Sequence, residues 1–147
     1  LSWKGFSLNA QFSWVADRWM FNNDRFFEES NGLYTVYNQS RRLLYDRWKK
    51  PGDVTDIPRY GITPQMDSRF LEDASFLRLK NLTLGYAVPQ NWLEKTHFFD
   101  SARIYVQGQN LLTFTKFSGI DPESSSNIYA AQYPMSRQFT LGIELSF

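Results

Sequence analysis

The 147-residue sequence contains no cysteine and a single histidine. The missing thiols exclude disulfides and thiolate metal sites, and a lone imidazole gives little support for a metal site of another kind. No stretch approaches 18 consecutive apolar residues, which excludes a transmembrane helix. The formal net charge is only +1, so the chain as a whole does not attract nucleic acid. We therefore expect no metal, no cofactor and no nucleic-acid partner.

Aromatic residues and alternation are what the sequence has in abundance. Phe, Tyr and Trp together make up 18% of the chain. Four segments alternate apolar and polar residues, a pattern that predicts β-strands with one apolar and one polar face. These segments are residues 5–15, 76–88, 102–115 and 137–147. Strands of this length and pattern fit either a soluble β-sandwich or an outer-membrane barrel.

Two of the four segments depart from strict alternation. In the second, Leu77 and Leu79 have the opposite parity to the leucines that follow them. We expect either a β-bulge near Lys80 and Asn81 or an upper end that leaves the hydrocarbon. In the third segment, Asn110 falls on the otherwise apolar face.

The last segment favours the membrane barrel, because it alternates up to the final residue, Phe147. Soluble domains usually let their last residues fray. The ending resembles the assembly signal of bacterial outer-membrane barrels, which implies contact with the barrel-assembly machinery, lipid and lipopolysaccharide. The residues that carry this resemblance are Thr140, Gly142, Leu145 and Phe147.

The connections between the strands differ in length. In outer-membrane barrels short turns face the periplasm and long loops face outside. We therefore expect residues 16–75 and 116–136 to be extracellular loops and residues 89–101 to be a periplasmic link. A helix is expected over Thr35–Trp48, where apolar residues recur at helical spacing before Pro51. Since about eight strands are the minimum for a membrane barrel, four strands would be only the final part of a larger one.

Several motifs occur together in the second half of the chain. They are Ser75-Phe76-Leu77-Arg78-Leu79-Lys80-Asn81-Leu82-Thr83-Leu84-Gly85-Tyr86, Ile104-Tyr105-Val106-Gln107-Gly108-Gln109-Asn110-Leu111-Leu112-Thr113-Phe114-Thr115 and Gly119-Ile120-Asp121-Pro122-Glu123. The chain resembles the C-terminal end of SusC/RagA-family TonB-dependent transporters, most closely over residues 75–147. Arg47-Trp48 and Asp56-Ile57-Pro58-Arg59 are similar to the last large extracellular loop of that family.

The resemblance implies an all-β fold: the last four antiparallel strands of a 22-stranded transmembrane barrel, with a long extracellular loop that contains a short helix. It also implies import of oligosaccharides or peptides across the outer membrane of a Gram-negative bacterium, with a SusD-like lipoprotein as partner. The TonB–ExbBD motor would act through a part of the protein outside this chain. Two alternatives stay open: the end of a passive porin-type barrel, and a soluble, aromatic-rich carbohydrate-binding β domain. No catalytic constellation supports an enzyme.

Two sets of residues are candidates for contact with cargo. The polar face of the third strand would line the lumen and touch either the plug or the cargo; its residues are Arg103, Tyr105, Gln107 and Gln109. Aromatic residues of the first long loop would stack on sugar rings, pack against the lid or form the core of the loop. These are Trp19, Phe21, Phe26, Phe27, Tyr34 and Tyr37.

Other polar residues receive simpler interpretations. The adjacent carboxylates Glu28-Glu29 and Glu72-Asp73 are expected on a solvated or lipopolysaccharide-facing rim rather than as an acid–base pair. Arg41-Arg42 is expected on a solvated helix face rather than against lipid phosphates. His97, in the short link, is not expected to bind a metal.

Overall fold

The computed structural model describes residues 1–95, 98–130 and 132–147. The chain is mostly β-sheet with a few short helices, which confirms the all-β prediction at that level. It divides into two compact units, and each is described by itself. Unit 1 comprises residues 1–15, 76–114 and 135–147, and unit 2 comprises residues 16–75 and 115–134.

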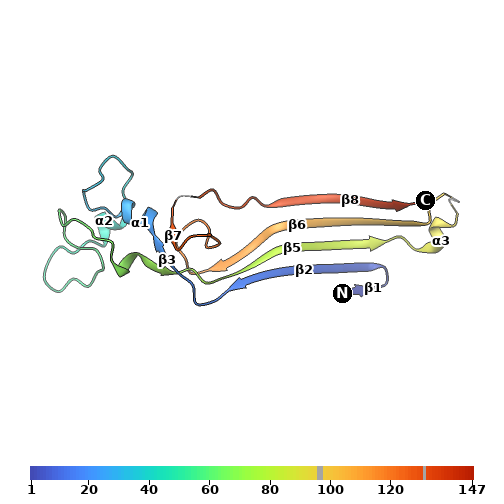
Figure 1. Ribbon diagram of the computed structural model, residues 1–147, viewed down its shortest axis with the longest axis horizontal. Coiled ribbons are helices and arrows are strands. Elements are labelled where there is room, and N and C mark those ends of the chain that lie inside the picture. The colour runs from blue at the N-terminus through green and yellow to red at the C-terminus, as the bar shows by residue number, and fades with distance from the viewer. Residues whose placement is uncertain (96–97, 131) are drawn as a thin grey trace. The chain divides into compact units, whose positions relative to one another are not determined.

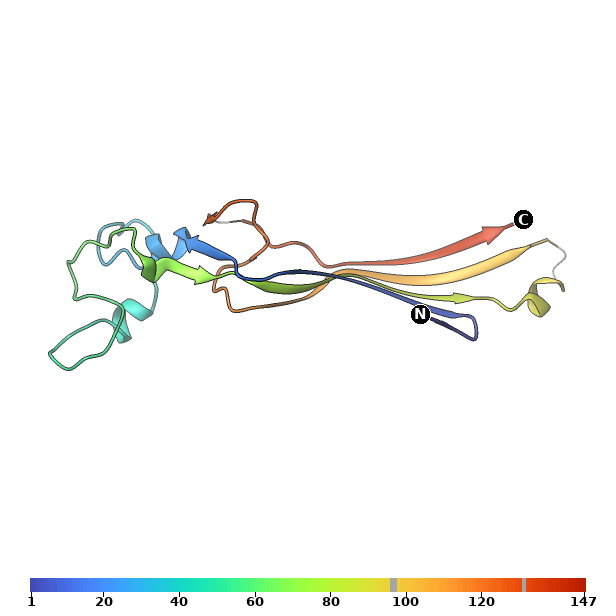
Figure 2. The ribbon, with the colours of Figure 1, turned by 60° about the horizontal axis from the view of Figure 1, so that its bottom comes forward.

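Unit 1 contains a five-stranded sheet in the order β1-β2-β5-β6-β8 (Figure 1). The strands are β1 Ser2–Trp3, β2 Phe6–Val15, β5 Phe76–Ala87, β6 Ser101–Thr115 and β8 Gln138–Ser146. β2 is antiparallel to β5 and β6 is antiparallel to β8. The strands of unit 1 lie in a single twisted layer (Figure 2). The four long strands form where the sequence alternates, because that pattern lets each strand present one apolar face.

Two elements of unit 1 were not expected from the sequence. The short strand β1 folds back on β2, with Trp3 opposite Phe6. Lys4 and Gly5 connect them with positive φ angles of 46° and 87°. Such a two-residue turn matches the right-handed twist of the flanking strands. A short helix, α3, covers Gln90–Leu93 in the link between β5 and β6.

The predicted bulge in the second long strand is confirmed. Gln11 of β2 lies opposite Asn81, but the next residue, Phe12, lies opposite Leu79. Lys80 is therefore the extra residue on β5. A one-residue insertion reverses the parity of everything beyond it, so the apolar residues at both ends of β5 share one face. In β6, Asn110 has a positive φ of 53°, which marks a backbone irregularity where the alternation breaks.

The apolar face of unit 1 is exposed rather than packed. In β8 the exposed fractions of Phe139, Leu141 and Ile143 are 74%, 72% and 64%. Their partners on β6 continue the same face, since Val106 lies opposite Leu141 and Ile104 lies opposite Ile143. A contiguous apolar surface of this kind marks contact with a protein or a membrane.

Unit 2 has a three-stranded sheet of its own in the order β4-β3-β7. Its strands are β3 Trp19–Asn22, β4 Leu71–Asp73 and β7 Ile128–Tyr129, and its helices are α1 Asn23–Glu28, α2 Arg42–Tyr45 and the 3₁₀ helix η1 Ser68–Phe70. β3 is antiparallel to β4 and parallel to β7. Met20 of β3 and Tyr129 of β7 form a buried cluster with Ala74 and Phe117.

The predicted helix over Thr35–Trp48 is wrong in extent, because only Arg42–Tyr45 is helical. The Gln39 side chain donates to the carbonyls of Tyr34 and Tyr37 and holds this stretch in turns. A side chain that satisfies local backbone acceptors offers the chain an alternative to a helix. Apolar residues that recur there at helical spacing stay exposed, with Val36 at 87% and Leu44 at 62%.

Candidate functional site

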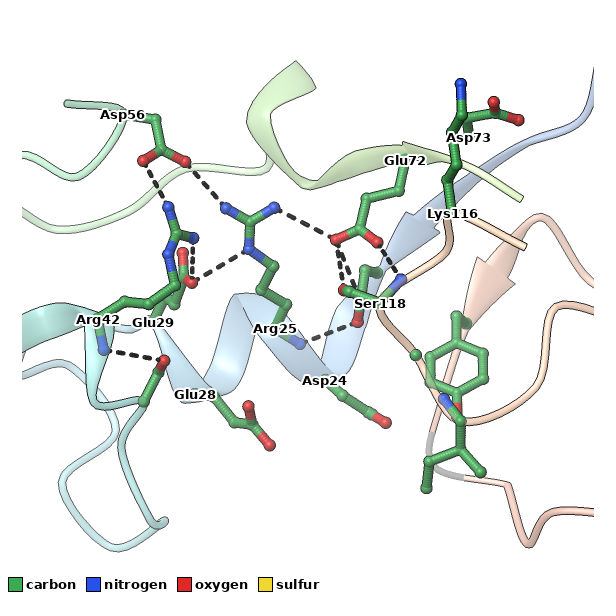
Figure 3. A pocket seen from close by; sticks show the side chains of 15 residues that line it. Asp24, Arg25, Glu28, Glu29, Arg42, Asp56, Glu72, Asp73, Lys116 and Ser118 are labelled. Carbon is green, nitrogen blue, oxygen red and sulfur yellow. Dashed lines mark hydrogen bonds and ion pairs between the residues drawn. The ribbon is translucent and has the colours of Figure 1, made fainter. Parts of the chain in front are cut away.

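Unit 2 contains a polar hollow of about 820 Å³ next to α1 (Figure 3). Its charged lining residues are Asp24, Glu28, Glu29, Asp56, Glu72, Asp73, Arg25, Arg42 and Lys116. Carboxylates outnumber cations here, so the hollow favours cationic or hydrogen-bond-donating groups over anions. α1 begins beside the hollow at Asn22, the N-cap residue, whose side chain accepts a hydrogen bond from the Arg25 amide at 3.0 Å.

Arg25 lies at the centre of the ion pairs that line the hollow (Figure 3). Its Nε contacts Glu29 Oε1 at 3.1 Å and its Nη2 contacts Asp56 Oδ2 at 2.9 Å. Its Nη1 contacts Glu72 Oε1 at 3.2 Å and also donates to the Arg69 carbonyl at 3.1 Å. One guanidinium therefore joins three carboxylates that are far apart in sequence, using the fixed fork of donors that lysine lacks.

Arg42, at the start of α2, makes a second bridge between two of the same carboxylates. It contacts Glu29 Oε1 at 2.6 Å and Asp56 Oδ1 at 2.7 Å. The Glu29 side chain is 1% exposed, and its Oε2 has no hydrogen-bond partner among the described residues. Because both guanidiniums are already paired with buried or half-buried carboxylates, their first role is to hold α1, α2 and the Asp56 segment together.

Glu72 of β4 ties the segment after β6 to the same network. Its carboxylate accepts from the Ser118 amide and from the Ser118 hydroxyl, both at 2.9 Å. It also accepts from Asn22 Nδ2 at 3.3 Å. The two parts of unit 2, residues 16–75 and 115–134, are therefore joined by a charged hydrogen-bond acceptor as well as by the β3–β7 pairing.

The pKa values of Glu72, Asp56 and Arg25 shift toward the charged forms. Burial opposes ionisation of Glu72, but the Ser118 donors and Arg25 outweigh it and lower its pKa. Burial likewise opposes ionisation of Asp56, and Arg42 and Arg25 lower its pKa below the ordinary value. For Arg25, burial lowers the pKa, but Glu29 and Glu72 more than reverse this effect and the net shift is upward.

The lowered pKa values of Glu72 and Asp56 predict that unit 2 loses stability in acid. Their ordinary values are 4.5 and 3.8, and the folded values lie below these. The folded state therefore binds fewer protons than the unfolded state, so this stabilisation is complete at neutral pH and disappears as the pH falls below about 4.5 through the folded values. Amide hydrogen exchange in unit 2 of the full-length protein, corrected for the intrinsic rate, should accelerate over this range. Glu72→Gln should reduce the pH dependence of this exchange. An unchanged pH profile in that variant would show that Glu72 does not contribute to the loss of stability in acid.

The predicted aromatic set divides into a packed group and one outlying residue. Phe26 is buried and packs edge-on against Phe70, with ring centroids 5.4 Å apart. The group also includes Phe21, Phe27, Tyr34 and Tyr37, whose rings contact one another or Phe26. Trp19 is 53% exposed and donates to the Asp17 carboxylate at 3.4 Å. The geometry places Phe26 inside the unit and leaves Trp19 and Tyr37 accessible.

The predicted lumen-facing residues share one face of unit 1 with other polar side chains. Gln107 donates to Asn81 Oδ1 at 3.2 Å, and Asn81 donates to Gln11 Oε1 at 3.1 Å, which joins three strands in one row. Gln109 lies opposite Gln138. Arg103 and Tyr105 belong to the same face: the guanidinium of Arg103 lies 5.8 Å from the centroid of the Tyr105 ring and donates to the Ser7 hydroxyl of β2 at 3.2 Å. Cross-strand contacts of this kind are the unit by which sheets are stabilised.

The residues of the predicted assembly signal fall on both faces of β8. Thr140 and Gly142 lie on the polar face, opposite Gln107 and Tyr105. Leu145 lies opposite Ala102 on the apolar face. Phe147 stacks on Phe98, with ring centroids 6.2 Å apart. His97 lies outside the described residues.

The ion-pair network is the part of the site that sequence analysis missed. Glu29 was expected on a solvated rim, and this expectation is wrong because its side chain is 1% exposed. Arg42 was expected on a solvated helix face; its side chain is 38% exposed, but it pairs with Glu29. The network joins positions as far apart in sequence as Asn22 and Ser118, so no local periodicity predicts it. The one available signal was Asn22 three residues before Arg25, a spacing typical of a helix N-cap.

Comparison with known proteins gives one consistent result, although no family model matches the sequence. None of the described helices has the length and apolar character needed to cross a membrane. TonB-dependent receptor P3 of Formosa agariphila is 38% identical over 150 residues, which cover 86% of this chain and 15% of that protein. TonB-dependent receptor SusC of Bacteroides thetaiotaomicron is 40% identical over 82 residues, which cover 56% of this chain and 8% of that protein.

A solved structure extends the match to nearly the whole chain. The RagAB peptide transporter shares 45% sequence identity with a TM-score of 0.90, over 99% of this chain and 16% of the matched one. The chain thus spans about 15% of the length of receptor P3 and 16% of the matched RagAB chain. The motifs of the second half, the four long strands and these three relatives agree, and the chain belongs to the SusC/RagA family of TonB-dependent receptors.

Proposed function

We propose that this chain is part of an importer of oligosaccharides or peptides in the outer membrane of a Gram-negative bacterium, and that it works with a SusD-like surface lipoprotein. The observation that carries the proposal is the sheet of unit 1, with one exposed apolar face and one hydrogen-bonded polar face. Such a sheet suits a barrel wall between lipid and an aqueous lumen. The relatives support it, since they are receptors and a peptide transporter rather than enzymes.

The wall is completed by strands outside this chain. The sheet of unit 1 ends at β1 on one side and at β8 on the other, so it has two edges. In lipid, each unpaired backbone group at such an edge costs several kcal/mol, which only a closed barrel avoids. We propose that the sheet is part of a closed barrel of 22 strands. The four long strands here are the last of them.

The orientation follows from the lengths of the connections. The two segments of unit 2 are long and face the outside, where the SusD-like lipoprotein and the cargo meet the transporter. The Lys4-Gly5 turn and the link at residues 89–101 are short and face the periplasm. The TonB–ExbBD motor acts through another part of the protein, and the barrel-assembly machinery reads the end of β8 through Thr140, Gly142, Leu145 and Phe147.

Two groups of side chains are placed for contact in this arrangement. On the polar face, Gln107 and Gln109 face the lumen, where they contact the plug or the cargo. In unit 2, the accessible Trp19 and Tyr37 can stack on a sugar ring or pack on the lid, whereas the buried Phe26 supports them. The RagAB relative is named as a peptide transporter, so peptides are candidate cargo beside oligosaccharides.

Uptake by cells that carry the full-length protein tests the function. Labelled oligosaccharides and labelled oligopeptides are offered to cells with and without the transporter gene. We expect accumulation of one cargo class, saturable and abolished when tonB is deleted. Uptake that persists without TonB and rises linearly with concentration would favour the porin alternative, and uptake of neither class would contradict import.

A further inference from the structure

Tyr105 of β6 lies over a glycine of the terminal strand. Its direct partner across the ladder is Gly142. A methyl group added at Gly142 would overlap the Tyr105 ring and hydroxyl, and it would meet them closer than real side-chain atoms approach one another. Gly142 therefore leaves a notch in the polar face of β8, and the Tyr105 ring fills it.

Arg103, two residues earlier on the same face, crosses a second glycine. A methyl group added at Gly85 of β5 would lie 2.8 Å from Arg103 Nε and 2.8 Å from Nη2. The guanidinium passes over this gap and donates from Nη2 to the Ser7 hydroxyl of β2 at 3.2 Å. Its Nη1 contacts Glu144 Oε2 of β8 at 3.1 Å. One side chain of β6 thus reaches β2 on one side and β8 on the other.

Alternation alone does not fix the register of β8 against β6. A one-residue slip of β8 would turn its apolar residues to the polar face and is strongly disfavoured. A two-residue slip keeps every residue on its own face, so alternation does not exclude it. Gly142 is the single glycine of β8, and either two-residue slip would place Thr140 or Glu144 against the Tyr105 ring.

The same slips would also remove the ion pair. In the observed register Arg103 lies opposite Glu144. A two-residue slip in one direction would place Gly142 opposite Arg103, and in the other direction Ser146. Neither of these carries a charge that could pair with the guanidinium. The notch and the ion pair therefore favour one register over both alternatives.

We propose that Arg103 and Tyr105 are positioning residues that select the register of the terminal strand β8 through Glu144 and Gly142. Their side chains lie flat across neighbouring strands and are engaged there, so contact with cargo is not their main role. The glycine in the predicted assembly signal then has a physical cause within the sheet, because it must admit Tyr105. The inference rests on the pairing inside unit 1 and does not depend on which cargo is imported.

Cysteine pairs that report the register test the proposal in the full-length protein in its outer membrane. This chain has no cysteine, and any elsewhere in the protein is replaced by serine. Val106→Cys with Leu141→Cys joins the observed partners, whereas Val106→Cys with Phe139→Cys or with Ile143→Cys joins partners slipped by two residues. Directly opposed strand positions meet the distance that a disulfide needs, and positions two residues away do so much less often.

We expect only the observed pair to crosslink in the otherwise unaltered sheet. In the Arg103→Ala/Tyr105→Ala protein, crosslinking of a slipped pair should rise above background in the membrane-inserted fraction. Gln107→Ala/Gln109→Ala is the matched control, with two truncations on the same face of the same strand, and it should keep the observed register. Slipped pairs that stay at background when Arg103 and Tyr105 are both truncated would overturn the proposal.

A rescue experiment keeps the proposal testable if the double truncation inserts poorly. Gly142→Ala should lower the folded fraction about tenfold, within the range that overpacking a tight site costs. Tyr105→Ala should restore folding in the Gly142→Ala protein by removing the overlapping ring. Gln138→Ala, on the same face of β8 and outside the predicted assembly signal, should have little effect. Equal impairment with and without Tyr105 would show that the notch does not exist for this ring and would overturn its part in the proposal.

Discussion

Replacing Leu141 with arginine should destabilise the full-length barrel in a bilayer by about 2–4 kcal/mol, the cost of a cationic side chain at the lipid face near the midplane. Leu141 is 72% exposed on the apolar face of β8, and its partner Val106 continues that face. An arginine there must either enter hydrocarbon or bend toward the interface. Equilibrium folding of the full-length protein into lipid vesicles, measured with denaturant, gives the free-energy change.

The neighbouring residue supplies the matched control. Thr140 lies on the polar face, opposite Gln107, so Thr140→Arg places the same charge in the same strand but toward the lumen. It should cost much less than Leu141→Arg, because the guanidinium remains in water or meets polar groups. If the two substitutions lowered stability equally, the assignment of the two faces to lipid and lumen would be wrong.

Replacing Arg25 with alanine should be the most damaging single change in unit 2. It removes one partner from Glu29, Asp56 and Glu72 together, and the Glu29 side chain is 1% exposed. Breaking a buried ion pair by removing one partner costs about 3–5 kcal/mol, since the other charge stays buried. We expect about 3 kcal/mol, the lower end of that range, because Arg42 still contacts Glu29 and Asp56.

Amide hydrogen exchange of unit 2 in the full-length protein measures this loss locally. A change of about 3 kcal/mol in the opening free energy corresponds to exchange more than about a hundredfold faster. Arg41→Ala is the control, because Arg41 is exposed and its described contact is with the Tyr45 ring at 5.7 Å. Exposed substitutions of this kind usually change stability by less than about 0.5 kcal/mol. Similar exchange in the two variants would refute the central role of Arg25.

The long strands were predictable from the sequence because their pattern is local. Alternation with a period of two identifies a strand without reference to its neighbours, and the parity reversal at Lys80 revealed the bulge in the same way. β1 was missed because two residues are too few to alternate. Its turn signal, Lys4 followed by Gly5, is weaker than the Asn-Gly or Asp-Gly pairs that usually mark such hairpins.

The structure of unit 2 was not predictable to the same degree. Its helices are short, and side-chain bonds such as those of Gln39 to nearby carbonyls decide where the chain turns. The hollow is built by residues from separated segments, with Arg25 on α1, Glu72 on β4 and Ser118 after β6. Pairing of this kind depends on the tertiary fold, and single-sequence periodicity contains no signal for it.

The polar face of unit 1 was predictable only in part. Alternation placed Arg103 and Tyr105 on the correct face, because side-chain direction follows from parity. It gave no indication that both side chains lie flat over glycines of adjacent strands, since Gly85 and Gly142 are distant in sequence from β6. The register of the strands was needed to bring each glycine beneath its partner.

The most direct measurement of the central claim, that unit 1 is a wall between lipid and water, is an accessibility scan along β8. Nitroxide labels are attached to single cysteines in the full-length protein in lipid vesicles. At Phe139→Cys, Leu141→Cys and Ile143→Cys we expect frequent collisions with oxygen, which partitions into lipid, and rare collisions with a water-soluble nickel complex. At Thr140→Cys and Glu144→Cys we expect the opposite balance. Free access of the nickel complex to all five positions would contradict the account.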